Sequence, residues 1–210
     1  MSLELFGHPF SSYTWKALIP LYETETPFTF RNIEEPDNHA AFVAVWPVGK
    51  FPLLVEDGVP IMESSIIVEH VAPVMVPNDR EEEVRLLDRI FDSHVMTPTQ
   101  AIVAEHLPFI TQTPDENRIA RARAALDNIY PWLDARLAGR TWAAGEEFTL
   151  ADCAGAPSLF YADWVQPIPD EFETLKAYRA RALARPSVAR VVDEARPYRH
   201  LFPLGAPDRD

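Results

Sequence analysis

The sequence predicts a small mixed α/β unit followed by an all-helical unit. Residues 3–62 alternate short strand-like runs with helical stretches, whereas the apolar periodicity beyond residue 80 is helical throughout. Between the two, residues 73–79 hold two prolines and an Asn-Asp pair, a composition typical of a linker. We therefore expect one domain at residues 1–77 and a second at residues 84–210.

The first unit is expected to begin with a strand, a helix and a parallel strand. The predicted strands are residues 3–6 and 28–33, the second because its apolar and polar side chains alternate. The helix between them starts at Ser11-Ser12 and runs to about Glu23, and a short helix follows at residues 37–45. Such a unit, when it is extended by an antiparallel hairpin, gives a small mixed sheet.

A hairpin and a helix start complete this unit. Strands at residues 51–55 and 59–62 flank an Asp57-Gly58 turn, which is a strong hairpin signal between apolar runs. Pro52 cannot donate to a sheet, so it indicates a special backbone geometry, with a cis peptide bond as one option. Glu63-Ser64-Ser65 is typical of a helix start, and this helix is expected to reach about residue 72. A helix N-terminus beside a fixed backbone edge suits a short peptide-like ligand that carries a carboxylate.

The second unit is expected to consist of helices only. Thr149-Leu150-Ala151-Asp152 resembles a capping box, and the helix that follows, to about residue 163, is apolar almost all round and should be buried. The other predicted helices are residues 80–105, single or kinked at Pro98, residues 115–138, and residues 175–183 and 187–195, which Pro186 separates.

Composition and charge exclude several partners and compartments. The net charge of −13 disfavours nucleic acid and anionic membrane surfaces, both of which need clustered Lys and Arg. The single cysteine, Cys153, rules out an intrachain disulfide and fits a reducing compartment; in its apolar stretch it is expected to be a buried small hydrophobe. We see no signal peptide and no apolar run of the ~18 residues that would span a bilayer, so a cytoplasmic protein is expected.

Four stretches, taken together in their order and spacing, resemble the cytosolic glutathione S-transferase family, in its serine-type, bacterial-like form. They are Ser11–Lys16 after the first strand, Gly49–Pro52, Glu63–Ser65 and Phe148–Asp152. The resemblance covers nearly the whole chain. It implies a thioredoxin-like N-terminal domain that binds glutathione, an all-α C-terminal domain that lines a second-substrate pocket, and a homodimer.

The resemblance implies that Ser11, with Ser12 a close second, activates the glutathione thiol. A thiol near pKa 8.5 is mostly protonated at neutral pH, and each unit of lowering needs ~1.4 kcal/mol of thiolate stabilisation. A hydroxyl hydrogen bond to the sulfur supplies about 1.5–3 kcal/mol and a helix N-terminus about 0.3–1 kcal/mol. The alternative is that these serines only cap the helix. Phe6 stands where other classes have tyrosine, and the loop has no cysteine, so Tyr13 is the remaining hydroxyl.

The resemblance also implies a set of glutathione contacts. The main chain of Phe51, before a cis Pro52, would pair with the cysteinyl backbone of the ligand, as an added strand does. Ser64 would hold the γ-glutamyl carboxylate and Glu63 the ammonium group. Lys50, or more weakly His39, would reach the glycine carboxylate. The ordinary alternatives are an edge-strand proline, a plain N-cap and solvated side chains. The expected glutathione-binding residues are Phe10, His39, Lys50, Phe51, Pro52, Glu63 and Ser64.

The electrophile would bind in a cleft between the two domains, where small-molecule pockets are common. Beside Phe10, its expected lining is His94, Met96, Tyr161 and Trp164, although each of these residues, taken singly, suits core packing as well. Glutathione is the only expected cosubstrate, and no metal is expected.

Three functions remain open at this level. The leading one is a glutathione transferase that detoxifies a small hydrophobic electrophile by thiolate attack. A second is a non-catalytic adaptor or binding protein of the same fold. Two features leave this function open: Pro20 lies inside the first helix, and Val45-Trp46-Pro47 stands where the family commonly has Asn-Pro. A third is a glutathione-dependent isomerase or peroxidase.

Overall fold

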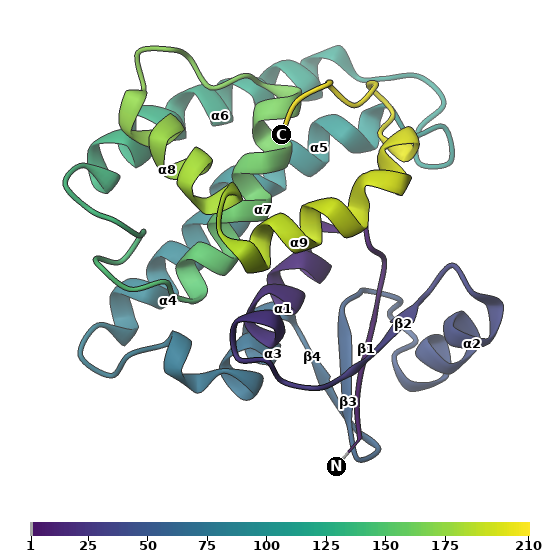
Figure 1. Ribbon diagram of the computed structural model, residues 1–210. Helices are drawn as coiled ribbons and strands as arrows, with labels where there is room; N and C mark the ends of the chain where they lie inside the picture. The colour runs from purple at the N-terminus through teal and green to yellow at the C-terminus, as the bar shows by residue number, and fades with distance from the viewer. Residues whose placement is uncertain (1) are drawn as a thin grey trace.

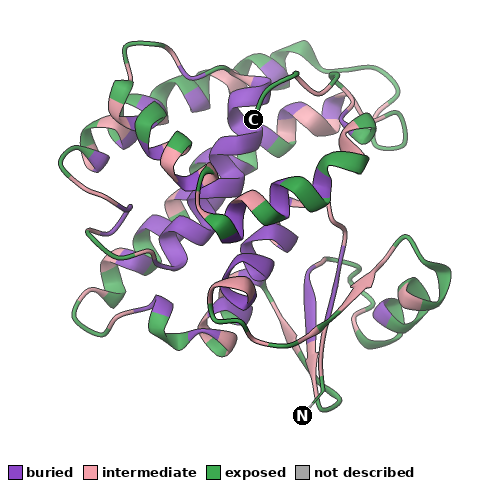
Figure 2. Cartoon of the chain, in the orientation of Figure 1, coloured by how far each residue is buried: buried purple, intermediate pink, exposed green. Residues whose placement is uncertain are grey.

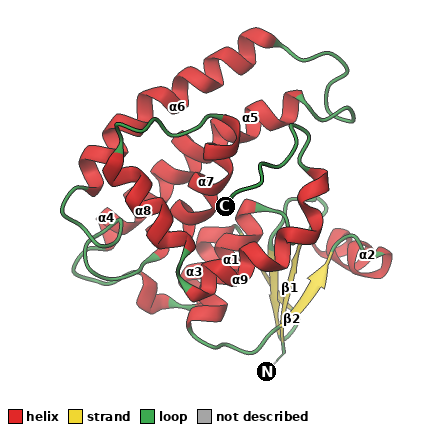
Figure 3. Ribbon diagram, turned by 45° about the horizontal axis from the view of Figure 1, so that its top comes forward, coloured by secondary structure: helices red, strands yellow, loops and turns green. Residues whose placement is uncertain are grey.

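The computed structural model describes residues 2–210, so the first residue of the predicted N-terminal domain lies outside it. The first part of the chain forms a four-stranded sheet in the order β2-β1-β3-β4, at one end of the molecule (Figures 1 and 3). β1 pairs parallel with β2 and antiparallel with β3, and β3 pairs antiparallel with β4. The mixed sheet of a thioredoxin-like domain is therefore confirmed. The strands are β1 (Leu3–Gly7), β2 (Thr29–Asn32), β3 (Leu53–Glu56) and β4 (Val59–Met62).

The hairpin between β3 and β4 turns at the predicted pair. Asp57 and Gly58 have φ angles of 46° and 84°, and positive values at both positions are what a two-residue turn of this twist requires. β3 begins at Leu53, so Phe51 and Pro52, expected inside the strand, lie before it. Pro52 lacks the N–H that a ladder needs. The Phe51–Pro52 peptide bond is cis, as the proline indicated.

Helices cover both faces of the sheet (Figure 1). α1 (Ser12–Glu23) and α3 (Ser64–Val71) lie on the face that carries Leu5 and Leu54, and α2 (Pro36–Val45) lies on the other face. Neighbouring residues of a strand point to opposite faces, which is why Phe6 and Leu53 pack with Phe42 of α2 instead. The α1 side also faces the helical domain, so it is the more deeply buried of the two (Figure 2).

The second part of the chain is all-helical and packs around one central helix. Every residue of α7 is buried, as expected for a helix that is apolar on all sides (Figure 2). Its capping box is present, because Thr149 N donates to Asp152 Oδ2 at 2.9 Å. The α-helices are α4 (Glu81–Ile90), α5 (Thr97–Glu105), α6 (Glu116–Leu137), α7 (Leu150–Val165), α8 (Glu173–Leu183) and α9 (Pro186–Ala195).

Two prolines of the helical domain stand near helix starts. The expected helix 80–105 is divided by a π-helical segment, η2 (Phe91–Met96), and Pro98 is the second residue of α5, directly after that segment. Pro186 is the first residue of α9 and separates it from α8 as predicted, at a position where a missing N–H costs no helical hydrogen bond. The short helices η1 (Pro73–Met75), in the predicted linker, and η3 (Arg196–Leu201), after α9, were not anticipated.

The two domains are joined by helix packing and by ion pairs. α1 packs on α7 and α9, and at its C-terminal end Glu23 accepts from Arg185 Nε and Nη2 at 2.7 and 2.5 Å. These bonds, with one from Ser187, hold the pKa of Glu23 below its usual value despite its partial burial. Cys153 of α7 is fully buried, and burial raises the pKa of its thiol. Within residues 2–210, no helix combines the length and apolarity that crossing a bilayer requires.

Candidate functional site

Two adjoining cavities lie between the thioredoxin-like domain and the helical domain. The larger has a volume of about 510 Å³ and the smaller about 350 Å³. Tyr13, Lys50 and Phe51 line both, so the two cavities meet at the loop that precedes the cis proline. A ligand with a polar peptide-like part and a reactive end could occupy the two together.

The larger cavity is mostly apolar and draws its walls from both domains. From the first domain come the β1–α1 loop and the segment before β3, and from the second come η2, α5, α7 and the C-terminal segment. Its lining residues are His8, Phe10, Ser11, Ser12, Tyr13, Gly49, Lys50, Phe51, Met96, Thr99, Gln100, Val103, Leu107, Phe109, Tyr161, Leu201, Phe202 and Pro203.

Ser11 combines a capping role with a place in the larger cavity. It is the N-cap of α1, and its Oγ accepts from Thr14 N at 3.3 Å. Capping uses an oxygen lone pair and leaves the hydroxyl proton available as a donor. Ser12, the first residue of α1, is nearly buried and lines the same cavity. The helix N-terminus adds partial positive charge at this point, so the arrangement can stabilise an anion.

Tyr13 is a third hydroxyl at the junction of the cavities. Burial, followed by the carboxylate of Asp92, raises the pKa of Tyr13 to about 12. Its hydroxyl therefore stays protonated at neutral pH and can donate a hydrogen bond, but it cannot act as a base there. From sequence it stood past the helix cap, but the structure brings it to both cavities.

The smaller cavity lies between the cis proline and the start of α3. Phe51 and Pro52 line one side, and Glu63 and Ser64 line the other. Glu63 has a φ of 69°, a conformation that costs a non-glycine residue of the order of 1–3 kcal/mol. Ser64 is the first residue of α3 and nearly buried, so free N–H groups of this helix end lie beside the cavity.

A buried group of charges forms the floor beside the smaller cavity. Lys16 of α1 is 1% exposed, and its Nζ lies 2.5 Å from Asp88 Oδ1 and 2.7 Å from Asp92 Oδ2. Arg89 lies 2.6 Å from Asp88 and 2.9 Å from Asp92. Ser65 donates to Asp88 and accepts from Lys16, both at 2.9 Å. The two cations balance the two anions, and burial raises the pKa of Asp92 while Lys16 opposes the rise.

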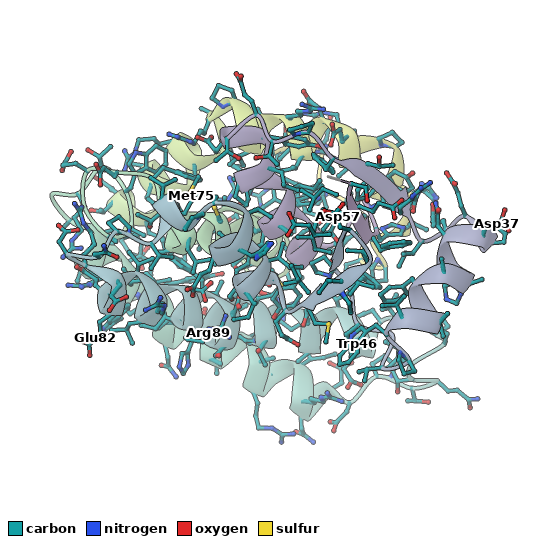
Figure 4. All side chains as sticks on the ribbon, turned by 90° about the horizontal axis from the view of Figure 1, so that it is seen from below. Asp37, Trp46, Asp57, Met75, Glu82 and Arg89 are labelled. Carbon is teal, nitrogen blue, oxygen red and sulfur yellow. The ribbon has the colours of Figure 1, made fainter. Side chains whose placement is uncertain are left out.

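Five lining residues of the smaller cavity were not anticipated as ligand contacts, namely Trp46, Arg89, Asp92, Ser93 and Thr97. Arg89 and Asp92 reach it from α4 and η2, and Trp46 reaches it from the end of α2. Figure 4 shows Arg89 and Trp46 on the same underside of the molecule, contributed by different domains. Trp46 had been noted only as a departure near the site. Asp92 left no local signal, because its buried partner Lys16 is far away in the chain, and Arg89 is held by the neighbouring Asp88 and Asp92.

The structure places the predicted site residues unevenly. Phe10, Ser11, Ser12, Met96 and Tyr161 line the larger cavity, Pro52, Glu63 and Ser64 the smaller, and Lys50 and Phe51 both. Trp164 stands behind the wall, with its ring centroid 6.3 Å from that of Phe10. His39 and His94 line neither cavity. His39 is exposed on α2, on the far side of the sheet, and His94 is exposed on η2. Among the described residues, no three or more His, Cys, Asp and Glu side chains gather as metal ligands.

Comparison with known families gives two adjacent matches. A model of the glutathione S-transferase N-terminal domain matches residues 5–73, and a model of the glutathione S-transferase C-terminal domain matches residues 91–186. Together they span both halves of the fold and every cavity-lining residue except Arg89 of α4 and the C-terminal segment.

Individual relatives agree with this result over nearly their full length. Glutathione S-transferase F6 of Arabidopsis thaliana is 25% identical over 205 residues, covering 90% of this chain and 99% of the relative. Glutathione S-transferase GstB of Escherichia coli K12 is 29% identical over 210 residues, covering 90% and 97%.

Solved structures show the same fold. A glutathione S-transferase from Rhodospirillum rubrum superposes with a TM-score of 0.76 at 27% identity, over 90% of this chain and 91% of that one. A glutathione S-transferase from Methylobacillus flagellatus, solved with GSH bound, has a TM-score of 0.79 at 24% identity, over 90% and 98%. At 24% identity, the similarity to the Methylobacillus flagellatus structure supports the fold alone.

Proposed function

Because this chain belongs to the glutathione S-transferase family, we propose that it is a glutathione transferase, which ionises the thiol of glutathione and delivers the thiolate to a small hydrophobic electrophile. One observation carries the proposal. The hydroxyl of Ser11 lies at the N-terminus of α1 and lines a largely apolar cavity that meets a polar cavity at Phe51.

Glutathione would occupy the smaller cavity and extend its thiol toward the larger one. Main-chain groups of Phe51 would pair with the cysteinyl backbone of the ligand. Ser64 and the N-terminus of α3 suit the γ-glutamyl carboxylate, and the carboxylates of Glu63 and Asp92 suit its ammonium group. Lys50 lines both cavities and suits the glycine carboxylate.

Thiol activation would come mainly from a serine at the start of α1. A hydrogen bond from a hydroxyl to a thiolate and the helix N-terminus together supply about 2–4 kcal/mol, enough to lower a thiol pKa by one to three units. Ser11 is the first candidate, Ser12 the second, and Tyr13 the third. The electrophile would then lie against Phe10, Met96 and the helical wall, so that binding brings its reactive carbon to the sulfur.

We also propose that the protein works as a homodimer paired through α3 and α4. Ile66 and Leu86 are 54% and 52% exposed on these two helices, although both are large and apolar. The helices are held side by side by Arg85, which donates to Glu69 at 2.9 and 3.1 Å. Exposed apolar side chains next to paired charges are typical of an interface. Because Cys153 is a free thiol, a reducing compartment such as the cytoplasm is the proposed location.

The test is conjugation of glutathione to a generic aryl halide by the wild type and by Ser11→Ala, Ser12→Ala and Tyr13→Phe variants. Loss of the activating hydroxyl should lower kcat/KM by about 10- to 100-fold and reduce the ultraviolet absorbance of the bound thiolate. The other two variants should stay within a few-fold of wild type. If none of the three lowers the rate, the proposed activation is wrong.

Retention on immobilised glutathione separates the transferase from a scaffold that does not bind the tripeptide. One structural feature supports the non-catalytic adaptor: the bulky indole of Trp46 lines the cavity that the tripeptide would occupy. A wild type that is not retained, and a Trp46→Ala variant that is, would favour the adaptor.

A further inference from the structure

We propose that His8 is a positioning residue for Ser11, which it holds in place through the unprotonated Nδ1 of a neutral imidazole. The inference rests on the proposed function, because it assigns Ser11 a reaction to be positioned for. His8 is the first residue after β1 and opens the loop that leads to Ser11, and its side chain lines the larger cavity.

Two consecutive amides of this loop terminate on His8. Phe10 N donates to the ring Nδ1 at 3.0 Å, and Ser11 N donates to the main-chain carbonyl at 3.0 Å. The loop therefore folds back on the residue that starts it. The main chain of His8 holds the backbone of Ser11, and the imidazole of His8 holds the residue just before it, Phe10. A hydroxyl that must meet a sulfur atom needs this kind of support, because a displacement of about 1 Å can cost 10²-fold in rate.

The hydrogen-bond pattern selects one tautomer of the ring. Nδ1 accepts a hydrogen bond, so it carries no proton, and in the neutral ring the proton sits on Nε2. Nε2 lies 3.1 Å from Glu34 Oε1, where it can donate. The side chain is 17% exposed, and the ring of Tyr198 meets it edge-on at 5.1 Å. Both nitrogens are thus satisfied in the Nε2–H form only.

Protonation of the ring would remove the acceptor that the loop uses. The added proton on Nδ1 would point at the N–H of Phe10, and two donors cannot form a hydrogen bond. The titratable and charged groups that face His8 are Glu34 after β2, Tyr198 of η3, and Lys50 across the shared cavity.

Two substitutions test the role of the acceptor. His8→Leu removes the acceptor. His8→Asn supplies another, because an Asn side chain accepts from the backbone N–H two residues further along. His8→Leu should lower kcat/KM for conjugation about five- to tenfold, the loss expected for one hydrogen bond, mainly through kcat. His8→Asn should restore most of that rate.

A double-mutant cycle distinguishes positioning from general support of the fold. In a Ser11→Ala background, His8→Leu should cost less than about twofold, because the group that it positions is gone. Equal losses in both backgrounds, or full activity of His8→Leu beside a damaged Ser11→Ala variant, would overturn the inference. So would a His8→Asn variant that folds as the wild type does but is as slow as His8→Leu.

Nitrogen NMR of the imidazole checks the tautomer without any turnover. The wild type should show an unprotonated Nδ1 and a protonated Nε2 at neutral pH. A protonated Nδ1 at neutral pH would overturn the inference whatever the rates are. If the tautomer is as expected and the wild type neither binds nor conjugates glutathione, the proposed function fails while the contact between His8 and the loop stands.

Discussion

The two cavities that meet at Phe51 are built in different ways. The first domain's side of the smaller one includes two short segments with unusual backbone geometry, a cis peptide bond at Phe51–Pro52 and a positive φ at Glu63. The larger one collects side chains from many distant places, including the exposed loop after α5 and the C-terminal segment. Local backbone geometry thus contributes to the smaller cavity, which is proposed to bind glutathione. Tertiary packing shapes the larger cavity, which is proposed to bind the electrophile.

Charge separates the halves as well. The smaller cavity rests on a charge-balanced group that joins α1 to α4 and η2, in which Lys16, Asp88 and Asp92 are buried and Arg89 is exposed. The larger cavity is lined by apolar and aromatic side chains for the most part, and its rim includes Phe109, which is 82% exposed. A change in the first half should therefore affect the fold, whereas a change in the second should affect the choice of substrate.

The largest effect is expected from Lys16→Met. This substitution leaves Asp88 and Asp92 buried with only Arg89 to balance them, and breaking a buried ion pair from one side costs about 3–5 kcal/mol. The free energy of unfolding, measured with urea, should fall by that amount. Lys50→Met, at the exposed lysine shared by both cavities, should cost less than about 0.5 kcal/mol. Equal losses of unfolding free energy in Lys16→Met and Lys50→Met would contradict the distinction between the buried lysine and the exposed one.

A smaller loss of stability is expected from Gly7→Ala. A Cβ on Gly7 would lie 2.6 Å from Thr14 Cγ2 and 2.7 Å from Thr14 Oγ1, so β1 and α1 would have to move apart. Overpacking of this kind costs about 1–3 kcal/mol and should displace the loop that carries Ser11.

The matched control for this substitution is the double variant Gly7→Ala/Thr14→Ala. It removes both close atoms, and Thr14 Oγ1 has no hydrogen-bond partner within the described part of the chain, so stability should largely return. A double variant that is no more stable than Gly7→Ala would show that the contact with Thr14 is not the cause.

The ion pair between Glu23 and Arg185, which joins the two domains, should make stability depend on pH. The pKa of Glu23 is lowered in the folded protein by Arg185 and Ser187, against the effect of burial. Its contribution to stability is therefore fully present above the unfolded value near 4.5 and is lost as pH falls through the lower folded value. Urea midpoints measured from neutral pH to about pH 3 should fall less for Glu23→Gln than for the wild type. Parallel curves for the two proteins would contradict this assignment.

The smallest effect on stability, but a specific effect on selectivity, is expected from Phe109→Ala. An exposed side chain contributes within about ±0.5 kcal/mol to folding, so the urea midpoint should not move. The KM for an apolar aryl halide should rise a few-fold while the KM for glutathione stays constant. A comparable rise in both values would mean that the cavities are not functionally separate.

The sequence could predict the features that depend on local backbone geometry better than those that depend on tertiary packing. The Asp57-Gly58 turn, the cis bond at Pro52, the helix start at Ser64 and the Thr149–Asp152 capping box each depend on neighbouring residues, and the structure confirms all four. For the same reason, the motifs predicted the side of the smaller cavity that Phe51, Pro52, Glu63 and Ser64 form, but not the side that the helical domain contributes.

What the sequence could not show depends on contacts between distant residues. The pairing of Lys16 with Asp88 and Asp92 crosses two domains, so nothing near Lys16 announces that it is buried. The same holds for Phe109, whose place at the cavity rim depends on how α5 and α6 meet. His39 and His94 were chosen by residue type, but the direction of a side chain on a helix depends on the tertiary packing of that helix, and both point to solvent.

Cys153 has a practical consequence for anyone who handles this protein. It is the only sulfhydryl of the chain, it is fully buried in α7, and burial raises its pKa, so it resists alkylating and disulfide-forming dyes in the native state. A thiol-reactive label added to the folded protein with a stoichiometric amount of tripeptide would therefore count the ligand's sulfur alone. No cysteine-free variant would have to be prepared first.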